Sequence, residues 1–224
     1  MKKASEIVTA EQRAQVSAAV SEAESKSCCE IVPVVATASG RYDRAEDLVG
    51  LWCVMAGAAI AFSTFPGNVE SGHWGGIAIW VQILLLLAVM SICFLVGAVL
   101  ADRLPGLRRL FTARQQMSEE VNLRARELFF DRRVHHTSAA SGVLIFVSLY
   151  ERMAVVLGDR RVVETLGEGF PEELCQRLTA SLKQADVGSA ICDTIHHATP
   201  FLVSALPRTD SDVNELSDAL VLLD

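Results

Sequence analysis

The sequence predicts an α/β fold: a small mixed β-sheet with helices on both faces, interrupted by a two-helix transmembrane hairpin. Residues 142–149 form a continuous apolar run of the kind found in central strands, and helical patterns occur on both sides of it. The segments 48–65 and 75–100 contain no Asp, Glu, Lys or Arg. A short strand pattern at 30–36 needs partners, and the later strands are expected to supply them.

The first segment, residues 1–47, is expected to begin the α/β domain. Thr9 is followed by Gln12 in a capping-box pattern, and a helix is predicted from there to about Lys26. The next residues are rich in β-branched side chains and predict the strand at 30–36. Pro33 has no N–H to donate, which favours an edge strand or a bulge.

Two apolar segments, 48–65 and 75–100, are predicted to cross a membrane. A bilayer core of about 30 Å needs about 20 helical residues. The second segment exceeds that length, whereas the first lies near the lower limit, where a buried core helix is the alternative. Nine residues join the two segments, and a helical hairpin would satisfy their backbone polar groups inside the hydrocarbon. We therefore expect residues 48–100 to form a transmembrane hairpin.

Basic residues flank this predicted hairpin, whereas the link 66–74 contains none. The positive-inside rule then predicts a multi-pass protein of the bacterial inner membrane with both termini in the cytoplasm. The N-terminal residues lack the apolar core of a secretory signal. The topology prediction depends on six residues: Arg41, Arg44, Arg103, Arg108, Arg109 and Arg114.

Residues 101–206 are expected to complete the α/β domain, followed by an acidic tail over 207–224. An apolar stripe predicts an amphipathic helix over 107–133, with its basic end near anionic lipid headgroups. Strands are predicted at 142–149 and 152–158, and residues 162–165 offer a third. The last predicted elements are two helices, at 171–185 and 189–206.

Composition excludes several classes of protein. The chain of 224 residues is 51% hydrophobic and 21% charged, so it is not collagen-like, disordered or a disulfide scaffold. A net charge of −7 argues against a general nucleic-acid binder, which would usually be basic. Six cysteines show no CxxC spacing and are expected to be free thiols.

No catalytic residue is assigned, because the sequence contains no P-loop, dinucleotide fingerprint or nucleophile elbow. Asp159 is the best single candidate for chemistry, since it directly follows an apolar strand, where α/β folds often place ligands. Nearby acids could help it bind a divalent cation such as calcium. A solvated turn with surface acids is the favoured alternative. The acids concerned are Glu164, Glu168, Glu172 and Glu173.

Several motifs, taken in order, resemble the TPM domain. They are TAEQRAQVSAAVSEAE followed by CEIVPVVAT, then GVLIFVSLYERMAVVLGD, and two closing helices. The stretches VHHTSAASGVLIFVS and DVNELSDALVLL resemble a bacterial branch with a two-span insertion. The resemblance implies an α/β sandwich; some members are acid phosphatases, some bind calcium, and others maintain membrane complexes. The turn Tyr150-Glu151-Arg152 only partly matches the Asp-Asp-Arg-like turn of the hydrolases.

These observations lead us to expect an integral membrane protein with a cytoplasmic TPM-like domain. The domain is expected to be a non-enzymatic interaction or membrane-complex maintenance module. Its expected partners are membrane lipid and a membrane protein complex, and not nucleic acid. The alternative is a membrane-bound phosphatase or metal-assisted hydrolase.

Overall fold

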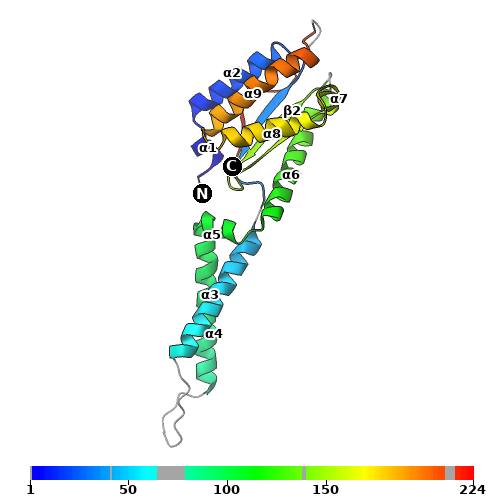
Figure 1. Cartoon of the computed structure of the whole chain (residues 1–224). Coiled ribbons are helices and arrows are strands. Elements are labelled where there is room, and N and C mark those ends of the chain that lie inside the picture. The colour runs from blue at the N-terminus through cyan, green and yellow to red at the C-terminus, as the bar shows by residue number, and fades with distance from the viewer. Residues whose placement is uncertain (1, 41, 65–78, 138–139, 210–214) are drawn as a thin grey trace, which may run out of the picture. The chain divides into compact units, whose positions relative to one another are not determined.

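The computed structural model describes residues 2–40, 42–64, 79–137, 140–209 and 215–224 (Figure 1). The chain divides into two compact units. Residues 41–114 form one, called here the helical unit. Residues 2–40 and 115–224 form the other, called the α/β unit. The insertion therefore extends beyond the predicted hairpin at 48–100 on both sides.

The α/β unit contains four strands, a 3-10 helix and a set of α-helices. Its elements are α1 (Ala4–Ile7), α2 (Ala10–Glu24), β1 (Ile31–Ala36), α6 (Arg114–Asp131), η1 (Val134–His136), β2 (Val143–Ser148), β3 (Met153–Gly158), α7 (Arg160–Leu166), α8 (Gly169–Ser181), α9 (Val187–Ala205) and β4 (Val221–Leu223).

The four strands form one mixed sheet in the order β3-β2-β1-β4. β1 runs parallel to both β2 and β4, and β3 runs antiparallel to β2. Ile31 pairs with Val143 and Ala36 with Ser148, although more than 100 residues lie between the two strands. The predicted pairing of the strand at 30–36 with the later strands is confirmed.

Helices cover both faces of the sheet, as predicted. On one face, Ile31, Val35 and Ile145 pack in a core with α2, α8 and α9. On the other, Val34 and Phe146 pack against α6. Because successive side chains point to opposite faces, every residue of β1 and β2 is buried. Burial of such side chains supplies about 1.5–3 kcal/mol each.

Pro33 lies in a strand with neighbours on both sides, so the expectation of an edge strand or a bulge is wrong. The carbonyl of Ala36 accepts a hydrogen bond from the end of β2, whereas the N–H of Thr37 donates to Leu223 in β4. The backbone N–H and C=O groups of alternate residues of β1 therefore point toward β4, and Pro33 is one of these residues. The ladder with β4 starts only at Val34, so the missing N–H leaves no ladder bond unmade.

Residues 162–165 are helical, which corrects the alternative of a third strand there. They belong to α7, and Asp159 is its N-cap residue, accepting a hydrogen bond from the N–H of Arg160 at 2.7 Å. This cap favours a helix strongly enough to override the β-branched side chains of Val162 and Val163. The fourth strand comes from the segment 207–224, for which only an acidic tail was expected.

The helical unit contains α3 (Asp43–Thr64), α4 (Ile79–Arg103) and α5 (Pro105–Leu110). α3 and α4 lie side by side and touch through small residues (Figure 1). A Cβ atom on Gly97 would lie 2.8 Å from the Cα of Gly50, and one on Gly57 would lie 2.5 Å from the Sγ of Cys93. Close approach of this kind is common between helices in membranes.

Within the described residues, one helical segment, Ile83–Arg103 of α4, is long and apolar enough to cross a membrane. No described segment of α3 meets both the length and the composition that such a helix needs. The predicted link 66–74 lies outside the described residues. The helix predicted over 107–133 is split into α5 and α6, and the break lies where the two units meet in sequence.

Candidate functional site

Asp159, the predicted metal ligand, lies at the start of α7. Its Oδ1 caps that helix, and its own N–H donates to the carbonyl of Gly142 at 2.7 Å. The residue is only 9% exposed. Its Oδ2 is buried and has no hydrogen-bond partner among the residues that the structure describes. The geometry gives Asp159 a local structural role, since it ends β3 and begins α7.

The position of Asp159 differs from the one that its sequence context indicates. Ligands in α/β folds bind beyond the carboxyl ends of parallel strands. β3, which precedes Asp159, runs antiparallel to β2, so Asp159 lies beside Gly142 at the amino ends of β1 and β2. The argument from strand ends therefore does not apply to this residue.

The acids near Asp159 in sequence do not gather around it. Glu164 is exposed and forms an ion pair with Arg160 at 2.7 Å. Glu173 lies 3.5 Å from His197, and Glu168 and Glu172 are exposed. In the described ranges, no group of three or more His, Cys, Asp or Glu side chains is arranged to hold a metal ion. The residues present therefore do not fit a calcium site.

A polar cluster lies at the opposite end of the sheet, beyond the carboxyl ends of β1 and β2. Glu151 in the β2–β3 turn is fully buried. Its Oε1 accepts the N–H of Ser39 at 2.8 Å, and its Oε2 accepts the hydroxyl of Ser148. Ser39 Oγ donates to Ser148 Oγ at 2.9 Å. The carboxylate thus ties the turn to the residues after β1 and is closed to solvent.

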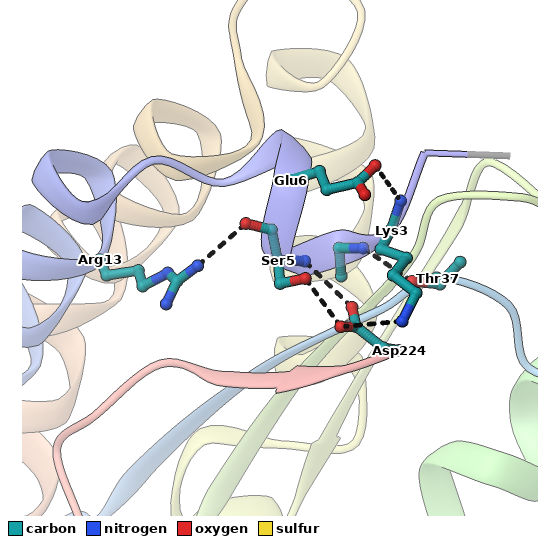
Figure 2. A network of polar contacts seen from close by, with 7 residues as sticks. Lys3, Ser5, Glu6, Arg13, Thr37 and Asp224 are labelled. Carbon is teal, nitrogen blue, oxygen red and sulfur yellow. Dashed lines mark hydrogen bonds and ion pairs between the residues drawn. The ribbon is translucent and has the colours of Figure 1, made fainter.

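The chain's own ends occupy the same edge of the sheet (Figure 2). Asp224 accepts hydrogen bonds from the N–H and hydroxyl of Ser5, at 3.1 and 2.7 Å. These bonds lower the pKa of the Asp224 carboxyl. The N–H of Ala4 donates to Thr37 Oγ1 at 2.7 Å. α1 and the end of β4 therefore cover the edge where an α/β fold usually binds a ligand.

A third cluster joins the amino end of β1 to the residues before β4. Glu24 accepts the N–H of Ile31 at 2.8 Å, and the N–H groups of Glu215 and Leu216 donate to Glu30. Burial raises the pKa of Glu24 to about 8, with Glu30 and a hydrogen-bonded Asp218 adding to the effect. Glu24 therefore holds a proton at neutral pH.

Sequence reasoning missed the clusters around Glu151 and Glu24. Glu151 lies three residues after the end of β2, and nothing in its local sequence distinguishes a buried acid from an exposed one. Its partner Ser39 lies 112 residues earlier, and no local pattern indicates that contact. Asp218, which forms a hydrogen bond with Glu24, lies still farther away in sequence.

The cysteines match their prediction, since all six are free. Burial raises the pKa of the Cys29 thiol well above its usual range, with the neighbouring Cys28 adding to the shift. Such a thiol stays protonated and is a poor nucleophile.

The six topology arginines are only partly described. Arg41 lies outside the described residues, and only the backbone of Arg44 and Arg108 is described. Arg103 is exposed in the last turn of α4. Arg109 is half-buried in α5, and Arg114 is exposed at the start of α6. Their effect on orientation stays a prediction.

Comparison with known proteins supports the fold alone. No protein-family model and no curated protein matches the chain. A solved structure is similar to it over 99% of both chains, with a TM-score of 0.57 and 16% identity. That structure is the NMR structure of the BA42 protein from the psychrophilic bacterium Bizionia argentinensis.

Proposed function

We propose that this chain is an integral protein of the bacterial inner membrane, anchored by the α3–α4 hairpin with both termini in the cytoplasm. One observation carries the proposal: the surface of the helical unit is apolar, unlike that of a water-soluble helix pair. Large apolar side chains are exposed, with Ile60 65% exposed and Leu95 62% exposed. The contact between the two helices instead includes three glycines: Gly50 lies against Phe94, Gly57 against Cys93, and Gly97 against Cys53 and Gly50.

Lipid is the environment that suits this arrangement. Contiguous apolar surface of this size is rare on soluble monomers. Helices associate in lipid through small residues, because lipid tails are as apolar as leucine. At 1.5 Å per residue, the 25 residues of α4 span about 37 Å, which is enough for a bilayer core. The first five residues of α3 include Asp43, Arg44, Glu46 and Asp47, so its uncharged part, 48–64, lies near the lower length limit of about 17 residues.

The α/β unit is proposed to be a TPM-like interaction or membrane-complex maintenance module. The carboxylates that would supply chemistry, Glu151 and Asp224, bind the chain's own backbone and hydroxyl groups. The surfaces left for other molecules are the outer faces of its helices. A membrane protein complex and anionic lipid are the proposed partners.

Alkaline extraction tests the anchor. Membranes carrying the full chain are washed with alkaline carbonate, and the chain should stay in the pellet until detergent is added. Replacing Leu86 and Leu95 together by arginine should release it, because each charge at mid-membrane costs about 2.5–3.5 kcal/mol. Leu123→Arg is the matched control, since Leu123 is an exposed leucine of the α/β unit. Release of the unchanged chain by carbonate would refute the anchor.

Reporter fusions test the orientation. A fluorescent protein at the C-terminus should fluoresce, and alkaline phosphatase at the same position should be inactive, because the C-terminus is proposed to be cytoplasmic. The reverse pattern would contradict the orientation while leaving the anchor intact.

A membrane-bound phosphatase or metal-assisted hydrolase is the rival proposal, motivated by the resemblance and by the unpartnered Oδ2 of Asp159. Purified protein would then hydrolyse a generic phosphomonoester, and Asp159→Asn would abolish most of that activity. Activity that Asp159→Asn leaves unchanged would remove this site.

A further inference from the structure

A groove of about 420 Å³ runs between α2 and α9. Its lining residues recur at i, i+3, i+4 and i+7 on both helices, from Gln15 to Glu22 on α2 and from Ser189 to His196 on α9. That spacing places one face of each helix along the same groove. Ala18, Ala19 and Cys192 are its apolar lining residues, and the other lining side chains are polar or charged. The groove is therefore two helical turns long.

A matching ridge lies on the outer side of α6. Leu123 is 56% exposed and Phe130 60% exposed, and Arg126 between them is also exposed. At 100° per residue these three side chains lie within an arc of about 60°. They point away from the buried stripe of Val121, Ala125 and Leu128. α6 thus presents two large apolar side chains and a cation to solvent.

The groove and the ridge match in length. Each spans eight residues of helix, or seven steps of 1.5 Å, which is about 10.5 Å. Anchors at i, i+3 and i+7 on an amphipathic helix are the usual way in which a helix binds a groove. The two large apolar side chains of the ridge would face the apolar lining of the groove, Ala18, Ala19 and Cys192.

Their charges match as well. Asp193 lines the groove and accepts a hydrogen bond from Ser181. In the part of the chain that the structure describes, no cation lies within ion-pair distance of Asp193 and no anion within that distance of Arg126. The other groove acid, Glu22, is already paired with Lys26 at 2.7 Å. Asp193 is thus the acid available to Arg126.

One molecule cannot bring these two surfaces together. α2 and α9 cover one face of the sheet and α6 covers the other, as the separate cores on the two faces show (Figure 1). We propose that the α6 ridge of one copy docks into the α2–α9 groove of a second copy. The contact is head-to-tail, so it can continue from copy to copy. This inference deepens the proposed interaction role by naming the partner as a second copy of the chain.

Cross-linking in membranes tests the contact, using Cys192 in the groove as one partner. Glu119→Cys places the second thiol on the ridge, one turn before Leu123, and keeps the three ridge side chains. A short bismaleimide should then give a ladder of dimers, trimers and higher species. Adding Cys192→Ser should abolish the ladder, whereas adding Cys175→Ser should leave it. Gln176→Cys, an exposed position on α8, is the control cysteine and should give no ladder.

Exchanging the charges of Arg126 and Asp193 distinguishes a lost contact between copies from a folding defect. Arg126→Glu in the Glu119→Cys chain should lower the cross-linked yield by about tenfold, because it opposes Asp193 with a like charge. Adding Asp193→Arg to the same chain should restore the ladder. Absence of a ladder, a ladder that survives Cys192→Ser, or a swap that fails to restore it would overturn the proposal, and so would adducts with another protein. Carbonate extraction and the reporter fusions do not depend on this contact, so they separate its failure from that of the anchor.

Discussion

At the scale of single residues, buried carboxyl groups hold the two ends of the sheet closed. Glu151 binds Ser39 and Ser148 beyond the carboxyl ends of β1 and β2. Glu24 binds Ile31 at the amino end of β1. A buried carboxyl is costly unless its oxygens have partners, so each of these residues makes the local structure depend on contacts distant in sequence.

Glu24→Gln should make the stability of the α/β unit less dependent on pH. The folded chain keeps a proton on Glu24 up to about pH 8, whereas the pKa of a free glutamate carboxyl is 4.5. The folded state therefore binds more protons between these values, so stability falls as pH rises through this window. At about 1.4 kcal/mol per pH unit, the unchanged chain should lose several kcal/mol of stability across this window, and the variant almost none.

The measurement for Glu24 is thermal unfolding of the full chain in detergent, followed by far-ultraviolet circular dichroism from pH 5.5 to 9.5. Glu11→Gln on the exposed side of α2 is the control and should unfold like the unchanged chain. An equal loss of stability with pH in the Glu24→Gln variant would show that another group is responsible.

Glu151→Ala should destabilise the α/β unit by about 2–3 kcal/mol, because it leaves the N–H of Ser39 and the hydroxyl of Ser148 buried without this acceptor. Glu151→Gln keeps one carbonyl oxygen for Ser39 and should cost less. The same unfolding measurement at a fixed pH checks both variants. Equal stability of Glu151→Ala and the unchanged chain would mean that the cluster does not hold the turn.

At the scale of elements, the sequence predicted those whose signal is local. The strands at 30–36, 142–149 and 152–158 follow from apolar or β-branched runs, and α9 from its apolar stripe. β4 has three residues, too few for a periodic signal, and it becomes a strand only because β1 offers it an edge. Residues 162–165 were ambiguous because the capping contact of Asp159 outweighs β propensity.

For the candidate site, too, local sequence signals were informative and long-range contacts could not be predicted. Asp159 was found because it follows an apolar strand, but the direction of that strand in the sheet depends on its pairing with β2. A sequence signal for a strand does not state that direction, so the end of the sheet at which Asp159 lies could not be predicted. Glu151 and Glu24 are recognisable only once the chain has folded.

Gly97→Val should force α3 and α4 apart. A Cβ at this position meets Gly50 Cα and Cys53 Sγ at 2.8 Å, and backbone cannot move aside as a flexible side chain can. The expected cost to the helical unit is about 1–3 kcal/mol. Leu95→Val, on the exposed side of α4, is the matched control and should cost little.

Tryptophan fluorescence during thermal unfolding in detergent measures the effect of Gly97→Val. All three tryptophans, Trp52, Trp74 and Trp80, lie within residues 41–114, so the signal reports the helical unit alone. Unchanged unfolding of the Gly97→Val variant would show that the two helices do not pack through this glycine in solution.

At the scale of the whole molecule, a helical unit with exposed apolar side chains interrupts an α/β unit with a buried core. The α/β unit has its own core on each face of the sheet, and among the described residues neither core includes one from 41–114. Domains with their own core usually fold by themselves. The two parts of the sheet, β1 and β2, pair directly although the insertion separates them in sequence.

The α/β unit should therefore fold without the insertion. Excising residues 41–114 and joining Gly40 to Gln115 by a short Gly/Ser linker is feasible, because a Cβ at Gly40 would lie 2.9 Å from the side chain of Glu120, close to the new junction. The product should be soluble without detergent and should unfold cooperatively in circular dichroism. It should also keep the pH dependence due to Glu24, because Ile31, Glu30 and Asp218, which act on that carboxyl, lie outside the excised residues. A product that aggregates or melts without cooperativity would show that the helical unit contributes to the core, and the insertion would then be part of the fold.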